Sequence, residues 1–318
     1  MLFRSASITP KALSIGAPSL ASKDYDSFTT AGTCTPGSLS GTVGGETLGV
    51  SCVGAAYSSA NVGSYTSTIT YTLTNGTSGT IGVASDYSLA SGSATGAVTA
   101  KALSIGAPSL ASKVYDGTTT AGTCTPGTLS GLVGSQTLGV SCAGSAYSSA
   151  NVGSSYASTI TYTLVNGGNG GLATNYSLVN GSVSNGTITA RSITITATNA
   201  DKVADSSTSS SAIPTLTSGS LAPGQTGTYS QSYASSAIAD SIVITPAVVS
   251  IKDSGNVDQK ANYSIILVNG SGNITAAAPV VVSGPAPAAP TPPVATDPNP
   301  VTNVATPVAP TKIGRAHV

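Results

Sequence analysis

The amino-acid sequence contains two nearly identical tandem copies of one segment. Residues 11–23 return as residues 101–113 without a change, and about 41 of 50 positions agree between residues 11–60 and 101–150. A more divergent third copy follows. Repetition at a fixed period indicates that each copy forms one structural unit of an array. A catalytic site gains little from being copied beside itself, so the repetition favours a structural or adhesive role.

The composition restricts the partners that such an array can have. Charged residues make up 7% of the 318 residues and the formal net charge is zero, whereas an ordinary soluble domain is roughly 25% charged. A neutral chain has no basic surface for nucleic acid or an anionic membrane. No run of 18 apolar residues is present, so we expect no membrane insertion. The 40% hydrophobic content favours folded repeats over disorder.

Hydrophobic residues alternate with polar residues along much of each copy. Within residues 67–73, Ile69, Tyr71 and Leu73 alternate with threonine, which gives one apolar and one hydroxyl face. Asn-Gly pairs supply the positive φ angles of tight turns. Short strands separated by such turns are typical of β-sandwiches. The sequence therefore predicts an all-β chain of tandem small Ig-like β-sandwich modules.

The copies also predict where the chain divides. We expect the end of an upstream segment at 1–10, a first repeat at 11–100, a second at 101–190, a divergent third at 191–276, a Pro/Ala-rich linker at 277–312 and a terminal hexapeptide at 313–318. The linker holds ten of the 18 prolines, which predicts a disordered, polyproline-like spacer. The hexapeptide matches the translation of a common sequencing adapter. We interpret it as an assembly artefact and the chain as an interior fragment.

The four cysteines fall as one pair in each of the first two repeats. They are Cys34, Cys52, Cys124 and Cys142. An even number, duplicated in a chain of extracellular composition, predicts one disulfide in each repeat. Free buried thiols and a metal site are the alternatives, although a zinc site needs four close ligands and the chain has one histidine.

Two Tyr-Asp pairs, Tyr25-Asp26 and Tyr115-Asp116, are candidates for binding calcium or sugar. A calcium loop needs several clustered oxygen ligands, and here one Asp stands among Ser and Thr. We therefore expect each Asp to form a turn through its side chain. Three further tyrosines follow an Asp or Asn and are expected at corners, where the ring packs and the hydroxyl finds a partner. These corner tyrosines are Tyr87, Tyr176 and Tyr263.

Catalytic chemistry has little support in the sequence. The single histidine, His317, lies in the terminal hexapeptide, so no Ser-His or Cys-His pair is expected. Glu46 is the only glutamate, and the second copy has Gln136 in its place. Paired carboxylates at a repeated position are therefore missing. We expect no enzyme, no catalytic residue, no cofactor and no metal.

The motif Lys-Val-Tyr-Asp-Gly-Thr-Thr at 113–119, which includes Gly117, resembles the YDG-type repeat of filamentous haemagglutinin-family proteins. Further marks of the resemblance are the segments 147–153, 175–176 and 188–190. The third copy is similar to a bacterial MBG-type module. The resemblance implies a large bacterial exoprotein at the cell surface or outside the cell, exported by two-partner secretion through an outer-membrane partner. It implies no catalytic residues.

Two functions fit an exported array of this kind. The repeats carry a binding face for a host-cell or matrix surface, multiplied for avidity, or they form a passive stalk that projects a distant binding domain. The absence of Trp favours the stalk, and we expect isolated repeats to bind host cells weakly or not at all. A carbohydrate- or matrix-binding module of a larger secreted enzyme is the alternative.

Overall fold

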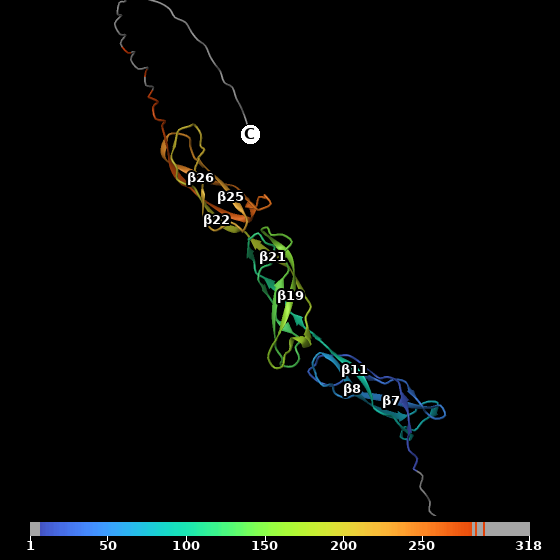
Figure 1. Ribbon diagram of the computed structural model, residues 1–318. Coiled ribbons are helices and arrows are strands. Elements are labelled where there is room, and N and C mark those ends of the chain that lie inside the picture. Colours follow the sequence, from blue (N-terminus) through green and yellow to red (C-terminus); the bar gives the residue numbers. More distant parts are fainter. Residues whose placement is uncertain (1–6, 282–283, 285–288, 290–318) are drawn as a thin grey trace, which may run out of the picture. The chain divides into compact units, whose positions relative to one another are not determined.

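The computed structural model describes residues 7–281, 284 and 289 (Figure 1). Of the described residues, 7–275 form one compact unit. Most of the predicted linker and all of the terminal hexapeptide lie outside the described residues. No helix in the described part of the chain combines the length and the apolar character needed to cross a membrane.

The compact unit consists of three modules, which we call modules 1, 2 and 3. Module 1 contains β1 (Lys11–Ala12), β2 (Ser14–Ile15), β3 (Ser19–Leu20), β4 (Lys23–Asp24), β5 (Cys34–Thr35), β6 (Leu39–Ser40), β7 (Glu46–Gly54), β8 (Gly63–Asn75), β9 (Thr80–Ile81), the short 3-10 helix η1 (Ala84–Asp86), β10 (Tyr87–Ser88) and β11 (Gly92–Thr99).

Module 2 repeats this order almost element by element. It contains β12 (Lys101–Ala102), β13 (Ser104–Ile105), β14 (Ser109–Leu110), β15 (Lys113–Val114), β16 (Cys124–Thr125), β17 (Leu129–Ser130), β18 (Leu138–Gly144), β19 (Gly153–Asn166), η2 (Ala173–Asn175), β20 (Tyr176–Ser177) and β21 (Gly181–Thr189).

Module 3 has fewer and longer strands. It contains β22 (Arg191–Thr196), β23 (Lys202–Val203), β24 (Thr215–Ser218), β25 (Thr226–Tyr233), β26 (Ala239–Lys252), η3 (Lys260–Asn262), β27 (Tyr263–Val268) and β28 (Gly270–Thr275).

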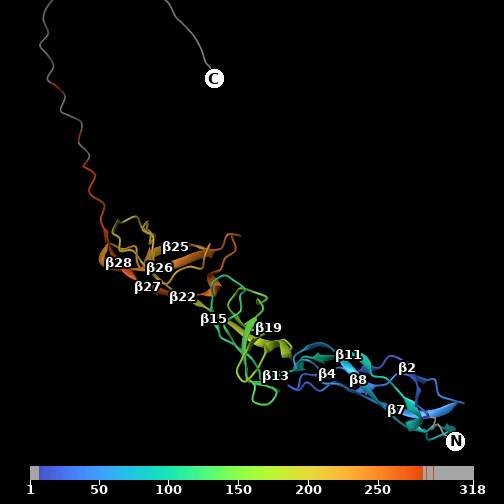
Figure 2. The ribbon, with the colours of Figure 1, turned by 60° about the horizontal axis from the view of Figure 1, so that its bottom comes forward.

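One sheet recurs in all three modules with the same strand order. It runs β4-β11-β8-β7-β9 in module 1, β15-β21-β19-β18 in module 2 and β23-β28-β26-β25 in module 3. The long strands β8, β19 and β26 pair on both sides and are labelled in both views (Figure 1, Figure 2). Module 3 adds a second sheet, β24-β22-β27, whereas modules 1 and 2 have short strand pairs such as β2-β6 and β3-β5. The predicted all-β class of tandem small β-sandwich modules is confirmed.

The predicted alternation of apolar and hydroxyl residues directs side chains to the two faces of the central strands. Ile69, Ile160 and Ile244 are each 0% exposed, while Thr68 and Thr70 on β8 are exposed. Successive side chains of a strand point to opposite faces, so this pattern buries the β-branched residues of one face.

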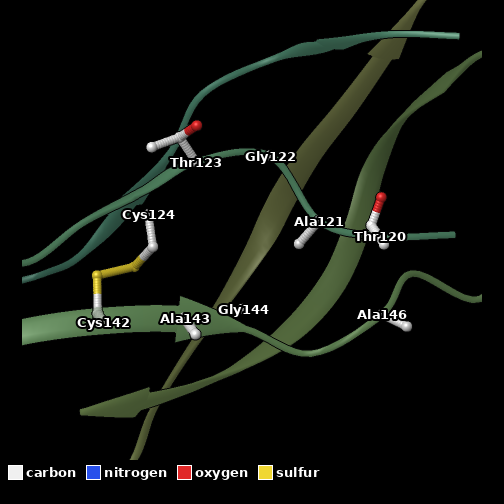
Figure 3. Close-up of a pocket in the computed structure, with 9 residues that line it drawn as sticks. All are labelled: Thr120, Ala121, Gly122, Thr123, Cys124, Cys142, Ala143, Gly144 and Ala146. Atoms are coloured by element: carbon white, nitrogen blue, oxygen red, sulfur yellow. A yellow bond between two sulfur atoms is a disulfide. The ribbon is translucent and has the colours of Figure 1, made fainter. Parts of the chain in front are cut away.

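Each of modules 1 and 2 contains a disulfide, as predicted. Cys34 bonds Cys52 and Cys124 bonds Cys142, each with a Cα–Cα distance of 5.6 Å, and no free cysteine remains in the described residues. The second disulfide borders a groove lined by small side chains (Figure 3). In both modules the bond joins a two-residue strand (β5 or β16) to a long strand (β7 or β18), which fixes the short strand to the main sheet.

Reduction of the disulfides is expected to destabilise modules 1 and 2 and to leave module 3 largely unchanged. Each bond closes a loop with a sequence separation of 18, for which the chain-entropy model gives about 3 kcal/mol. Hydrogen exchange of the full chain, measured peptide by peptide with and without reductant, checks this. Module 3, which has no cysteine, is the internal control. Equal loss of protection in all three modules would contradict the prediction.

Candidate functional site: the contacts between successive modules

Each of modules 1 and 2 holds one tyrosine at the end where the chain leaves the module. The backbone N–H of Tyr25 donates to the carbonyl of Thr99, at 2.9 Å, and that of Tyr115 donates to Thr189, at 2.8 Å. These bonds continue the parallel pairing of β4 with β11 and of β15 with β21. Only one residue separates β11 from β12, and one separates β21 from β22. Tyr25 and Tyr115, which we call the linking tyrosines, therefore lie beside the strand that enters the next module.

An ion pair and a turn fix the loop that carries each linking tyrosine. The Lys113 Nζ atom lies 2.8 Å from Asp116 Oδ1, and the same oxygen accepts the backbone N–H of Thr118 at 2.9 Å. This is the geometry of the Asx turn that the sequence suggests. Gly117 follows with φ 79°, a left-handed angle that glycine adopts without steric cost. The loop is therefore ordered by its own short-range contacts.

The same lysine–aspartate pair occurs in the other two modules. Lys23 lies 2.8 Å from Asp26, and Lys202 lies 2.7 Å from Asp205. The side-chain hydrogen bond from Lys202, together with bonds from Ser207, lowers the pKa of Asp205 to about 2. The carboxylate is therefore ionised at neutral pH and available as an acceptor in this loop.

Tyr25 of module 1 enters a site in module 2. Its side chain is buried, and its hydroxyl accepts a hydrogen bond from Gln136 Nε2 at 2.8 Å. The other end of the same amide, Oε1, accepts from the hydroxyl of Tyr176. The rings of Tyr25 and Tyr176 meet edge to face, with centroids 5.4 Å apart. One glutamine thus bonds a tyrosine from each module.

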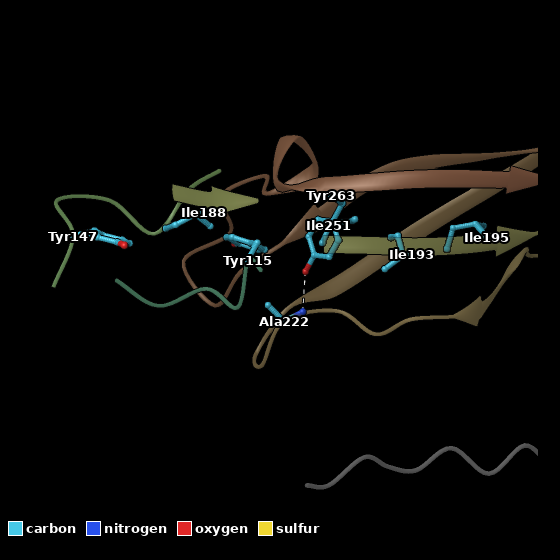
Figure 4. Packing of buried hydrophobic residues seen from close by; sticks show 8 residues of the cluster. All are labelled: Tyr115, Tyr147, Ile188, Ile193, Ile195, Ala222, Ile251 and Tyr263. Carbon is cyan, nitrogen blue, oxygen red and sulfur yellow. Dashed lines mark hydrogen bonds between the residues drawn. The ribbon is translucent and has the colours of Figure 1, made fainter. Parts of the chain in front are cut away.

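Tyr115 of module 2 makes the same contacts with module 3, and its ring lies beside Tyr263 and Ile251 (Figure 4). Gln225 Nε2 donates to its hydroxyl at 2.7 Å, while Gln225 Oε1 accepts from Tyr263 at 2.7 Å. The Tyr115 and Tyr263 rings have centroids 5.5 Å apart and an interplanar angle of 75°. Here the Tyr115 hydroxyl also donates to Gln259 Oε1 at 3.2 Å. The arrangement therefore recurs at both junctions, and we call the glutamine and its corner tyrosine the receiving pair.

An asparagine beside each receiving pair adds a second contact across the junction. Asn175, which is 0% exposed, accepts from the backbone N–H of Val62 at 2.9 Å and donates to Asn61 at 2.8 Å. At the second junction, Asn262 accepts from the N–H of Val152 at 2.7 Å and also donates to Asn151. Because both ends of a buried amide are satisfied, burial of this polar group is compensated.

The largest hydrophobic clusters cross the junctions between modules. One cluster joins Tyr115 and Ile188 of module 2 to Ile193, Ile251 and Tyr263 of module 3. Another joins residues of module 1 to residues of module 2. Burying one tyrosine contributes about 2 kcal/mol, and an edge-to-face pair adds about 1 kcal/mol. Ordering the single connecting residue costs about 1–2 kcal/mol, so the contacts outweigh the cost of fixing the junction.

The series of linking tyrosines ends at module 3. Ala204 occupies the equivalent position, since its N–H donates to Thr275 at 2.8 Å, as the linking tyrosines do to Thr99 and Thr189. Its methyl group packs against the core of module 3. Module 3 therefore receives a linking tyrosine and presents none.

The structure changes the sequence-based view of the tyrosines. The corner tyrosines Tyr87, Tyr176 and Tyr263 pack their rings and bond their hydroxyls as expected. For the pairs Tyr25-Asp26 and Tyr115-Asp116 the sequence predicted only a turn formed by the Asp, whereas the tyrosine rings lie against the next module. The signal that could have revealed this was the glutamine shared by copies two and three.

Tyr71 and Tyr162 occupy equivalent positions in modules 1 and 2. The hydroxyls of Tyr71 and Tyr162 are buried and have no hydrogen-bond partner among the described residues, and each lies close to a strand glycine, Gly92 or Gly181. The described residues contain no cluster of three or more His, Cys, Asp or Glu that could hold a metal. The junctions, in contrast, bring buried polar side chains of two modules together.

Comparison with known protein families identifies the repeats. The YDG domain model matches residues 9–95 and 99–185, which together make up more than half of the chain. The chain therefore belongs to the YDG-domain family, and its first two modules are YDG domains. A comparison with curated proteins finds no match.

Replacement of Tyr115 is expected to destabilise the chain more than replacement of Tyr162, a tyrosine inside the same module. Tyr115→Ala should lower the free energy of unfolding by about 3 kcal/mol through the cavity it leaves. Tyr115→Phe should cost about 1 kcal/mol, because Gln225 Nε2 loses its acceptor. Tyr162→Phe removes a hydroxyl without a partner and should be nearly neutral.

Urea denaturation of the full chain, followed by circular dichroism, measures these differences. Tyr162→Phe is the matched control, since it makes the same chemical change at another position in the same module. Equal effects of Tyr115→Phe and Tyr162→Phe would contradict the account of the junction.

Proposed function

We propose that this chain is the non-catalytic repeat region of a large exported bacterial surface adhesin of the filamentous haemagglutinin type, in which it acts as a stalk. Module 3 is, in this proposal, a related MBG-type module. The observation that carries the proposal is the contact of each linking tyrosine with the receiving pair of the next module. A stalk needs its units held in a fixed relation, and these contacts supply that constraint.

The pattern of hydrogen bonds supports a linear array. Polar side-chain bonds join module 1 to module 2 and module 2 to module 3, and within the described residues none joins module 1 to module 3. Contacts limited to neighbours are characteristic of repeat proteins, whose stability is a sum of unit and interface contributions. An array of this kind gains length by duplication without changing its interfaces.

The distribution of tyrosine side chains supports a passive role over a sugar-binding face. All 13 tyrosines lie in the described part of the chain, and none of them is exposed. Their rings fill cores and junctions, so they offer no aromatic platform to a carbohydrate. The repeats then project a binding domain located elsewhere in the protein rather than contacting a host-cell or matrix surface themselves.

The disulfides support a location outside the cytosol. Disulfide bonds persist in oxidising compartments and are rare in the cytosol, and modules 1 and 2 each contain one. Export through an outer-membrane secretion partner and display at the cell surface are part of the proposal.

The linking tyrosines are expected to hold the modules in a narrow range of relative positions. Spin labels at the exposed residues Thr70 in β8 and Thr245 in β26, attached through a keto amino acid that leaves the native cysteines paired, report the distance between modules 1 and 3. Pulsed electron–electron resonance of the full chain should give a narrow distance distribution. The double variant Tyr25→Ala, Tyr115→Ala should broaden it.

The control is the double variant Tyr71→Phe, Tyr162→Phe, which alters tyrosines inside modules 1 and 2. It should keep the narrow distribution. A wild-type distribution as broad as that of the Ala variant would contradict the stalk, and saturable binding of the full chain to host cells would contradict the passive role.

A further inference from the structure

Module 1 contains a receiving pair that no linking tyrosine occupies. The hydroxyl of Tyr87 donates to Glu46 and accepts from the backbone N–H of Val43 at 3.0 Å. Tyr176 of module 2 has the same two contacts, with Gln136 and with the N–H of Val133 at 3.1 Å. The hydrogen bond to Glu46 raises the pKa of Tyr87, so its proton stays on the hydroxyl. The site is therefore built in the same way as the occupied ones.

Tyr87 is 7% exposed, about as buried as Tyr176 and Tyr263, but the residues beside this pair are more exposed than their counterparts at the occupied sites. Asp86 is exposed, whereas its counterparts Asn175 and Asn262 are 0% and 5% exposed. Ile8 lies three residues before Lys11, as Val98 lies before Lys101. Ile8 is 96% exposed, but Val98 is 2% exposed because it packs inside module 1. Asp86 lies where a preceding module would cover the surface, and Ile8 holds the position that Val98 has at the end of module 1.

The hydrogen-bonding groups of this site select the chemistry of its occupant. In module 2, Gln136 donates to the Tyr25 hydroxyl. Glu46 has only acceptor atoms when ionised, so the group placed there must donate. A tyrosine hydroxyl does this, since it can donate as well as accept. Asp86 can likewise accept a backbone N–H, as Asn175 does from Val62.

We propose that Glu46, Tyr87 and Asp86 form the docking site for the linking tyrosine of another YDG-type module joined ahead of Lys11. The inference rests on the proposed function, because it extends the same tyrosine contact to one more junction. In the docked state the incoming tyrosine hydroxyl donates to Glu46, its ring meets that of Tyr87 edge to face, and Asp86 accepts a backbone N–H of the preceding module. Two carboxyl groups thus replace the two amides of the inner junctions.

The test inserts a second copy of residues 101–190 between Pro10 and Lys11 of the full chain. The copy of Tyr115 in the insert then precedes Lys11 by the same number of residues by which Tyr115 precedes Arg191. Hydrogen exchange is measured on peptides covering residues 42–48 and 83–89, whose sequences occur only in module 1. Protection there should rise at least about tenfold over the original chain. Glu46→Gln in the extended chain should retain this protection, because it recreates the inner form of the site.

The matched control carries Ala in place of the inserted linking tyrosine and should return protection to that of the original chain. Unchanged protection in module 1, with the receiving pair of module 3 still protected, would overturn this inference and leave the stalk standing. The proposed function itself would be overturned if the receiving pair of module 3 were also unprotected and Tyr115→Ala in the original chain left its exchange unchanged.

Discussion

The hydrogen bonds of one glutamine side chain hold each pair of neighbouring modules together. Its amide nitrogen donates to the tyrosine of the preceding module and its oxygen accepts from a tyrosine of its own. The modules are small and contain no Trp, so each has limited apolar surface to bury by itself. Sharing the buried tyrosine rings across a junction enlarges the core of both neighbours. Modules 1 and 2 therefore each gain stability from contact with the module that follows.

This dependence gives the array a direction and two different ends. Modules 1 and 2 each present a linking tyrosine, whereas module 3 has Ala204 at that position and packs it against its own core. At the other end, Glu46 and Asp86 stand where the inner junctions have Gln and Asn. The three described modules therefore differ in the tyrosine and in the amide or carboxyl groups that they present to a neighbour.

The sequence predicted the elements that depend on local pattern. Alternation along residues 67–73 indicated a half-buried strand, the duplicated cysteines indicated Cys34–Cys52 and Cys124–Cys142, and Asp116 forms the expected turn. It did not predict the partner of Tyr25, because Gln136 lies 111 residues away in another copy. No pattern within a single copy indicates a contact between two copies. The comparison of copies holds one, since Gln136 and Gln225 align, but only the fold places them against the preceding module.

The central claim is that Tyr115 and Gln225 stabilise the chain as a pair across the junction. A double-mutant cycle with Tyr115→Phe and Gln225→Ala in the full chain measures this coupling directly. We expect a coupling energy of about 1 kcal/mol, because each single variant already removes the shared hydrogen bond. Strictly additive effects of the two substitutions would show that the junction is not held by this contact.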